Sequence, residues 1–337
     1  MKRWPLYVML VLVIAVLVLR ETAVSHSIPL DITPSSYAYL PNIVKPLPTS
    51  TPTPTPTPLP GPDWLAYVNE FRLLAGLPVL TENDSWSYGG VLHSRYMVKE
   101  DEITHYENTA SAWYTQEGYD AGRNGNVAVS STTTASDEFA IDLWMTGPFH
   151  AVGILDPQLA QTGFGSYREA IGTWKMGATL DVLRGLGSLP PGITFPIYYP
   201  QDGGQAWLIS YGGSESPDPL TSCPGYSAPS GPPIILQLGS GSVTPNVTSS
   251  SFSQGSTPLE HCIFDETNYV NPNSTYQSLG RSVLGGRDAV VIMPRSPLTV
   301  GQTYTASITA NGTQYTWSFS VVNGRTSTQD TATWEIR

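Results

Sequence analysis

Few side chains in this 337-residue chain have the types that metal or proton chemistry needs, since it has five histidines and two cysteines. His105 is followed two residues later by Glu107, while Glu138 and Asp142 lie one turn apart on a segment with helical periodicity. Imidazoles with neighbouring carboxylates can bind a divalent cation or relay a proton. Motifs of common hydrolases and nucleotide-binding enzymes are absent, because the sequence contains no HExxH, GxSxG or Walker loop.

Three stretches with helical periodicity follow a proline-rich segment. Their apolar residues recur every three to four positions, as on the buried face of an amphipathic helix. The first stretch stops at Gly76-Leu77-Pro78, where glycine can adopt the left-handed conformation and proline prevents continuation. The predicted helices begin near Asp63, near Asn83 or Asp84, and near Ser136, and the third ends near Met145.

His93 lies on the apolar stripe of the second predicted helix, so we interpret it as a hydrogen-bonded core or boundary histidine rather than a site residue. Two β-like stretches, Gln161–Arg168 and Thr173–Leu183, follow the third helix. Helices followed by a short meander favour an α+β sandwich over a doubly wound parallel sheet.

Six motifs occur in one order between residues 67 and 167: YVNEFRLLAGLPVL, LHSRYM, ITHYEN, GNVAVS, DEFAIDLWMTGPFHAVGILDP and QTGFGSY. This series resembles the CAP superfamily, which includes cysteine-rich secretory proteins and plant pathogenesis-related proteins. It is most similar to the cysteine-free bacterial branch of SCP-like extracellular proteins. The resemblance implies an α-β-α sandwich. Asn69 and Arg72 match the first motif, and we interpret them as structural, with Arg72 donating to carbonyls or a carboxylate near the following turn.

The resemblance also implies a cleft with paired histidines, and His105 and His150 stand at the matching positions. Acidic residues complete this cleft in the family, and Gly125 stands where a GEN motif would place one of them. Glycine can neither bind a metal nor accept a proton through a side chain. Candidate replacements for the missing carboxylate are Glu107, Glu138 and Asp142. Because a metal centre needs three or four ligands, we expect a degenerate cleft; zinc is the metal it would suit, and no residue is assigned a catalytic role.

The N-terminus and the composition indicate export. Lys2 and Arg3 precede an apolar run at residues 4–19, which is the pattern of a secretory signal. We interpret residues 1–25 as a signal peptide or an uncleaved membrane anchor, so the protein is expected outside the cell or at its surface. Membrane contact is expected only through this segment. The formal net charge of −11 argues against nucleic-acid partners, whose phosphates need a cationic surface.

A proline-rich spacer, residues 26–62, separates this segment from the rest of the chain and contains the repeat TPTPTPTP. Alternating proline fixes the backbone dihedral φ and removes hydrogen-bond donors, so we expect an extended, semi-rigid connector. The predicted organisation is a spacer at 26–62, a CAP-like domain at 63–187, a β-module at 188–323 and a tail at 324–337.

The β-module is predicted from short apolar or alternating runs separated by Gly, Pro, Ser and Asn, with no helical periodicity after Leu189. Asn311-Gly312 is a strong hairpin signal, because both residues tolerate positive φ. A two-residue loop pairs Ile308 with Tyr315, Ala306 with Trp317 and Tyr304 with Phe319. The last hairpin resembles that of bacterial immunoglobulin-like modules and implies an all-β, immunoglobulin-like sandwich of about seven strands. In an oxidising compartment, we expect Cys223 and Cys262 to form a disulfide.

These features favour an exported, surface-associated CAP-domain protein that acts as a non-catalytic binding module. The family resemblance implies a lipid or sterol, an envelope component or a protein as its ligand. Two alternatives remain open. One is an extracellular hydrolase, either a peptidase or a cell-wall enzyme, that uses the histidine cleft. The other is a structural or adhesive surface protein in which the CAP-like segment is a stable scaffold.

Overall fold

The computed structural model describes residues 62–324 and 333–337. The predicted signal or anchor and nearly all of the proline-rich spacer lie outside the described residues. Within the described ranges, no helix is both long enough and apolar enough to cross a membrane.

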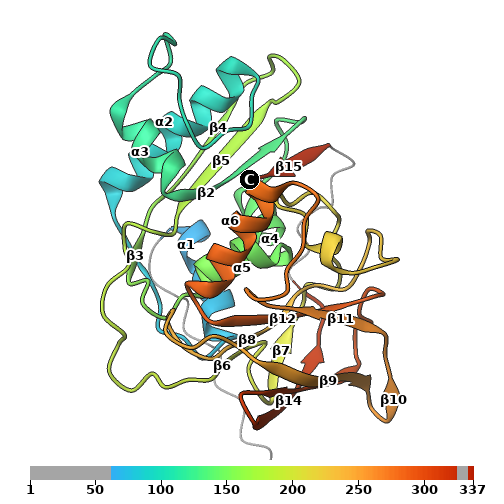
Figure 1. The fold of residues 1–337 in the computed structure, drawn as a ribbon. Helices are drawn as coiled ribbons and strands as arrows, with labels where there is room; N and C mark the ends of the chain where they lie inside the picture. The colour runs from blue at the N-terminus through green and yellow to red at the C-terminus, as the bar shows by residue number, and fades with distance from the viewer. Residues whose placement is uncertain (1–61, 325–332) are drawn as a thin grey trace, which may run out of the picture. The chain divides into compact units, whose positions relative to one another are not determined.

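The first part of the described chain is a sandwich of helices around an antiparallel sheet. Figure 1 shows α2 and α3 on one side of this sheet, with α1, α4 and α5 on the other. The four strands lie in the order β15-β2-β5-β4. The helices are α1 (Asp63–Leu73), α2 (Asp84–Glu100), α3 (Gln116–Arg123), α4 (Asp137–Thr146) and α5 (Pro148–Ile154). The strands are β2 (Gly125–Ser130), β4 (Phe164–Arg168), β5 (Met176–Asp181) and β15 (Trp334–Ile336), and β1 (Thr81–Glu82) pairs separately with β3 (Gln161–Thr162).

Side-chain caps define the starts of two predicted helices. The side chain of Asn83 accepts a hydrogen bond from the backbone of Trp86 at the start of α2, and that of Ser136 accepts from Phe139 at the start of α4. Helices α3 and α5 fall outside the predicted set. They are only 8 and 7 residues long, which is too short for apolar periodicity to stand out.

Two further sheets form the second part of the chain. The five-stranded sheet has the order β10-β9-β13-β14-β7, and the four-stranded sheet has the order β11-β12-β8-β6. Tyr304, Trp317 and Phe319 are buried in the core cluster that draws on both sheets. The strands are β6 (Ile197–Tyr199), β7 (Gly204–Ala206), β8 (Ile234–Gln237), β9 (Val247–Gln254), β10 (Thr257–Pro258), β11 (His261–Phe264), β12 (Ala289–Pro294), β13 (Thr303–Ala310) and β14 (Thr313–Val321).

The last hairpin has the predicted register. Strand β13 pairs with β14 so that Ile308 lies opposite Tyr315, Ala306 opposite Trp317 and Tyr304 opposite Phe319. Asn311 and Gly312 have φ values of 52° and 79°, the positive values that a tight two-residue turn requires. The turn residues and the alternation of apolar side chains specify the same pairing, which is why the sequence sufficed here.

The expectation that residues 188–323 contain only strands is wrong, because α6 (Ser274–Gly285) lies within them. Its N-terminus is capped by the side chain of Asn273, which accepts from the backbones of Thr275 and Tyr276. Only Gly280 and Leu284 of this helix are buried. So narrow a buried stripe leaves little apolar periodicity in the sequence, and the many Ser and Gly residues resemble a loop.

The two parts of the chain share a hydrophobic core, and all described residues belong to one compact unit. Phe149 of α5 packs edge-on against Tyr269, with ring centroids 4.9 Å apart. Phe71 of α1 lies 4.7 Å from Trp207. The buried side chain of Gln237 on β8 donates to the carbonyl of Leu155 at 3.0 Å. Helices α1 and α5 therefore bury one face against the second part of the chain.

Residues 334–336, which were expected within a tail, form the edge strand β15 of the first sheet. Strand β15 pairs antiparallel with β2, with Ile336 opposite Ala128. Trp334 packs edge-on against Phe139 of α4, at 6.1 Å between ring centroids. The sheet of the first part is thus completed by the far end of the chain (Figure 1).

Candidate functional site

The site begins with His150, which lies on the short helix α5. Its Nδ1 is 2.7 Å from Oε1 of Glu215, and its backbone N–H donates to the same oxygen at 3.0 Å. The side chains of His150 and Glu215 are 6% and 0% exposed. Because α5 has no side-chain cap of its own, Glu215 both orients the imidazole and caps the N-terminus of this helix.

Glu215 was not predicted as a site residue, and no local signal singles it out. It lies in a Gly-, Ser- and Pro-rich stretch, 65 residues from His150. One feature on the histidine side is informative. A Cβ built at Gly147 would lie 2.7 Å from the Glu215 carboxyl carbon, so glycine is needed there for the carboxylate to reach the start of α5.

The segment that carries Glu215 is fixed at several points. Ser216 donates its backbone N–H to the carbonyl of Ile336, and Ile336 donates to the carbonyl of Ser214, both at 3.2 Å. Strand β15 therefore holds this segment beside the first sheet. Farther along, the predicted disulfide between Cys223 and Cys262 is formed, with the Cα atoms 5.5 Å apart.

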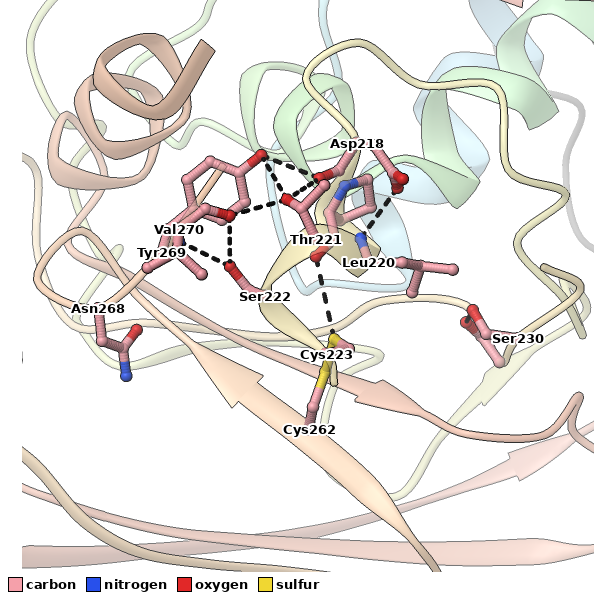
Figure 2. Close-up of a disulfide and its surroundings, with 12 residues drawn as sticks. Asp218, Leu220, Thr221, Ser222, Cys223, Ser230, Cys262, Asn268, Tyr269 and Val270 are labelled. Atoms are coloured by element: carbon pink, nitrogen blue, oxygen red, sulfur yellow. Dashed lines mark hydrogen bonds between the residues drawn. A yellow bond between two sulfur atoms is a disulfide. The ribbon is translucent and has the colours of Figure 1, made fainter. Parts of the chain in front are cut away.

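Figure 2 shows how the same segment is tied down beside the disulfide. The short 3-10 helix η1 (Pro219–Ser222) begins at Asp218, whose side chain accepts from the backbone of Leu220. The hydroxyl of Tyr269 donates to the Asp218 carbonyl at 2.9 Å, and Thr221 donates to the Val270 carbonyl at 2.8 Å. Glu215 thus projects from a well-anchored connection.

His105, the second predicted cleft histidine, follows α2 on the loop to α3. Its Nδ1 lies 2.9 Å from the carbonyl of Gly122, so this nitrogen carries the donated hydrogen. Burial, with a smaller contribution from the positive charges of His150, His93 and Arg337, lowers the pKa of His105 to about 4. At neutral pH, His105 is therefore an uncharged imidazole with a lone pair on Nε2.

Glu107, which follows His105, is bound to a different histidine. Its Oε1 lies 3.0 Å from Nδ1 of His93, and both side chains are fully buried. Nε2 of His93 donates to the carbonyl of Thr104 at 2.8 Å. A Cβ at Gly122 would lie 2.2 Å from the His93 ring, which explains a glycine at this point of α3. His93 is the hydrogen-bonded core histidine that its apolar stripe predicted.

The other two candidate carboxylates lie on α4. Asp142 is buried and accepts a 2.5 Å hydrogen bond from the hydroxyl of Tyr67 on α1. Burial, reinforced by the negative charge of Asp142, raises the pKa of Tyr67 well above its usual range. Glu138 is half-buried in the first turn of α4. The carboxylate that the structure brings to His150 is instead Glu215.

The donor set does not fit a zinc centre. Among residues 62–324 and 333–337, no three His, Cys, Asp or Glu side chains are grouped so that they could hold a metal ion. A zinc centre needs at least three protein ligands. Gly125 supplies no ligand, and Oε1 of Glu215 already accepts two N–H groups of His150. The arrangement suits hydrogen bonding between the two parts of the chain better than metal coordination.

Acidification is expected to destabilise the fold through His105. Its pKa of about 4 lies below the ordinary histidine value of 6.5. The stability that this group contributes is therefore complete above pH 6.5 and is lost as the pH falls from 6.5 to 4. We expect a loss on the order of 2 kcal/mol. Urea unfolding at a series of pH values would measure it, and the acid side of the profile should flatten in His105→Gln.

Glu215 changes the stability with pH in the direction opposite to His105, which provides an internal control. Burial raises its pKa above the ordinary value of 4.5, so stability from this group is complete below pH 4.5 and is lost as the pH rises towards its folded-state pKa. Glu215→Gln removes this opposing slope and should steepen the acid side of the profile. If the free energy of unfolding changed with pH in His105→Gln as it does in the unchanged chain, the lowered pKa of His105 would not be the cause of the acid destabilisation.

These observations define a class of protein: an α-β-α sandwich in which the charge of His150 affects His105, joined to a second, β-rich part. In agreement, residues 65–173 match the family model described as the Cysteine-rich secretory protein family, CAP. The match supports assignment of this part of the chain to the CAP superfamily.

A solved structure also aligns with the chain: an extracellular protein containing an SCP domain from Bacillus anthracis str. Ames. The sequences are 18% identical, and the alignment covers 36% of this chain and 39% of that one, with a TM-score of 0.26. That score is too low to establish a shared fold. Comparison with curated proteins found no match.

Proposed function

We propose that the protein is an exported, non-catalytic binding protein in which the histidine cleft of the CAP-like part has become a structural joint. By structural joint we mean the contact of His150 with Glu215 and the apolar packing around it, which hold the two parts of the chain together. The single observation that carries this proposal is the contact between His150 and Glu215. A carboxylate from the second part of the chain caps α5 and fills the hydrogen-bonding capacity of Nδ1. Nδ1 of His150 and the carboxylate of Glu215 are thus engaged in joining the two parts.

Further support comes from the extent of the joint. The shared core includes Phe149, Tyr269 and Trp207, and β15 links the Glu215 segment to the first sheet. Such a joint keeps the surfaces of the two parts of the chain in a constant arrangement, which suits a protein that binds or displays a ligand. The CAP match and the predicted export segment support an extracellular location.

We also propose the finer assignments within this frame. The described residues of the CAP-like part contain no cysteine, as in the cysteine-free bacterial branch, because the disulfide lies wholly in the second part. An immunoglobulin-like sandwich for residues 188–323 is supported by the two sheets, their shared core and the final hairpin. The parallel pairing of β14 with β7 and the presence of α6 depart from a simple seven-strand form.

Zinc titration tests the structural joint. The full chain should show no zinc binding in the micromolar range by calorimetry, and EDTA should leave its unfolding midpoint unchanged, because the donor set has fewer than three free ligands. His261→Ala serves as a matched control, since His261 on β11 contacts Ser250 and the carbonyl of Leu259 instead. Micromolar binding that disappears in His105→Ala but persists in His261→Ala would refute the proposal.

A hydrolase is the second candidate, and the same contact is the observation that favours it. A buried carboxylate on Nδ1 orients an imidazole for use of Nε2 as a general base. If this were its role, peptide or glycan fragments would be cleaved by the full chain and not by His150→Ala or Glu215→Gln. We expect no turnover with either substrate class, and turnover with this mutational pattern would favour the hydrolase.

A further inference from the structure

The connection from α2 to α3, together with α3 itself, presents three tyrosines, which we call the tyrosine surface: Tyr106, Tyr114 and Tyr119. The centroid of the Tyr119 ring lies 6.2 Å from each of the other two, and the ring planes are inclined by 52° and 55°. Tyr106 is 64% exposed, and the other two are half-buried. Rings at this separation and inclination pack against one another, and the high exposure of Tyr106 leaves part of this aromatic cluster facing solvent.

The tyrosine surface stands on a fixed backbone. The buried Glu107 accepts from the backbone of Thr115 at 2.9 Å while also contacting His93. The backbone of Asn108 donates to the hydroxyl of Tyr96 on α2, also at 2.9 Å. These bonds secure the connection at both ends of the stretch that carries Tyr106 and Tyr114. A fixed backbone lowers the conformational entropy lost when a ligand is bound.

Aromatic faces in this region already contact cations. The guanidinium of Arg123 lies 5.8 Å from the centre of the Tyr119 ring. On the neighbouring Trp113 ring, Lys99 and Arg95 lie at 4.7 Å and 5.5 Å. These distances are within the range in which a ring quadrupole attracts a positive charge. Tyr106 and Tyr114, by contrast, have no such contact among the described residues.

The net charge of the segment around the tyrosine surface favours a positively charged ligand. Residues 99–123 contain six acidic side chains and two basic ones. This excess repels phosphates and carboxylates and attracts cations. Stacking of a nucleic-acid base on the tyrosines is therefore disfavoured by the phosphates that would accompany it.

We propose that the tyrosine surface binds an organic cation of the quaternary ammonium class. Its methyl groups would lie against the rings of Tyr106, Tyr114 and Tyr119, with the positive charge stabilised by the rings and by the acidic excess of residues 99–123. This assignment rests on the proposed binding function, for which it names a class of ligand. It does not involve the structural joint between His150 and Glu215. The same headgroup occurs in free choline and in phosphatidylcholine.

Titration of the full chain with tetramethylammonium and choline tests the proposal. We expect dissociation constants in the millimolar range and about a tenfold loss of affinity in Tyr106→Ala and in Tyr119→Leu. The leucine preserves apolar volume in case alanine disturbs α3. Tyr88→Ala is the matched control, since Tyr88 is 61% exposed on α2, and it should bind as the unchanged chain does. Arg123→Ala should bind more tightly, because it removes an internal cation from the Tyr119 face.

A neutral isostere separates charge from shape. The alcohol 3,3-dimethyl-1-butanol has the shape of choline without its charge, and it should bind at least about tenfold more weakly. Vesicles of phosphatidylcholine, compared with vesicles of phosphatidylglycerol, distinguish the lipid source from the free cation. Equal binding of the isostere, equal losses in Tyr88→Ala, or no binding of either cation would overturn the proposal. Failure of this cation site would not contradict the proposed non-catalytic binding function. Zinc binding that depends on His105 would contradict that function, and it would not contradict the cation site.

Discussion

Replacing Arg72 with leucine should lower the free energy of unfolding by about 4 kcal/mol or more. Arg72 is fully buried on α1 and donates to four backbone carbonyls. The acceptors are Pro78 at 2.8 Å, Ile154 at 2.7 Å, Asp156 at 2.9 Å and Leu159 at 3.1 Å. Leucine would leave all four buried oxygens without their donor. Burial lowers the pKa of Arg72 to about 10, so the guanidinium is still charged at neutral pH.

Urea unfolding followed by circular dichroism would measure this loss, with Arg295→Leu as its control. Arg295 forms an ion pair with Glu260 at 3.0 Å, and its side chain is 49% exposed. A surface ion pair of this kind contributes little to stability, so the control should change the unfolding free energy by less than about 1 kcal/mol. Similar effects of the two variants would show that the Arg72 carbonyls find other donors.

Glu215→Ala should cost about 3 kcal/mol of stability, the second largest effect that we expect. The substitution leaves two buried N–H donors of His150 unpaired and removes the cap of α5. Glu215→Gln should cost less, because its side-chain oxygen can still accept a hydrogen bond. Thermal or urea unfolding of both variants would establish the order.

Glu260→Ala is the matched control for this substitution, since the Glu260 side chain is 72% exposed and its loss should be nearly neutral. A double-mutant cycle with His150→Ala then isolates the contact itself. Coupling above about 1 kcal/mol is expected for a buried charged hydrogen bond. If the two substitutions were simply additive, Glu215 would act as a helix cap alone and not as the partner of the imidazole.

Much of the first part of the chain could be predicted from local patterns. The starts of α2 and α4 are marked by the capping residues Asn83 and Ser136. The structural role expected for Arg72 and Asn69 is confirmed: Arg72 donates to carbonyls, while the Asn69 side chain and the Leu80 backbone exchange two hydrogen bonds. Caps, turns and periodic apolar stripes depend on neighbours in sequence, so they can be predicted without a tertiary structure.

Other features depend on contacts between distant residues. Helix α6 has too narrow a buried stripe to be predicted, and β15 is a strand because β2 offers it a free edge. The carboxylate at His150 comes from a segment with no distinguishing pattern. Of the three carboxylates proposed from the sequence, Glu107 binds His93 and Asp142 binds Tyr67. Proximity along the chain was a poor guide to which acid meets which histidine.

The sequence by itself determined the two histidines, the hairpin register, the disulfide and the missing carboxylate at Gly125, since each depends on residue identity or on short-range spacing. Only the tertiary structure decided what lies beside His150. Folding brings the Gly147 backbone, strand β15 and Glu215 to one point. A buried helix N-terminus and an imidazole N–H both need an acceptor, and the second part of the chain supplies it.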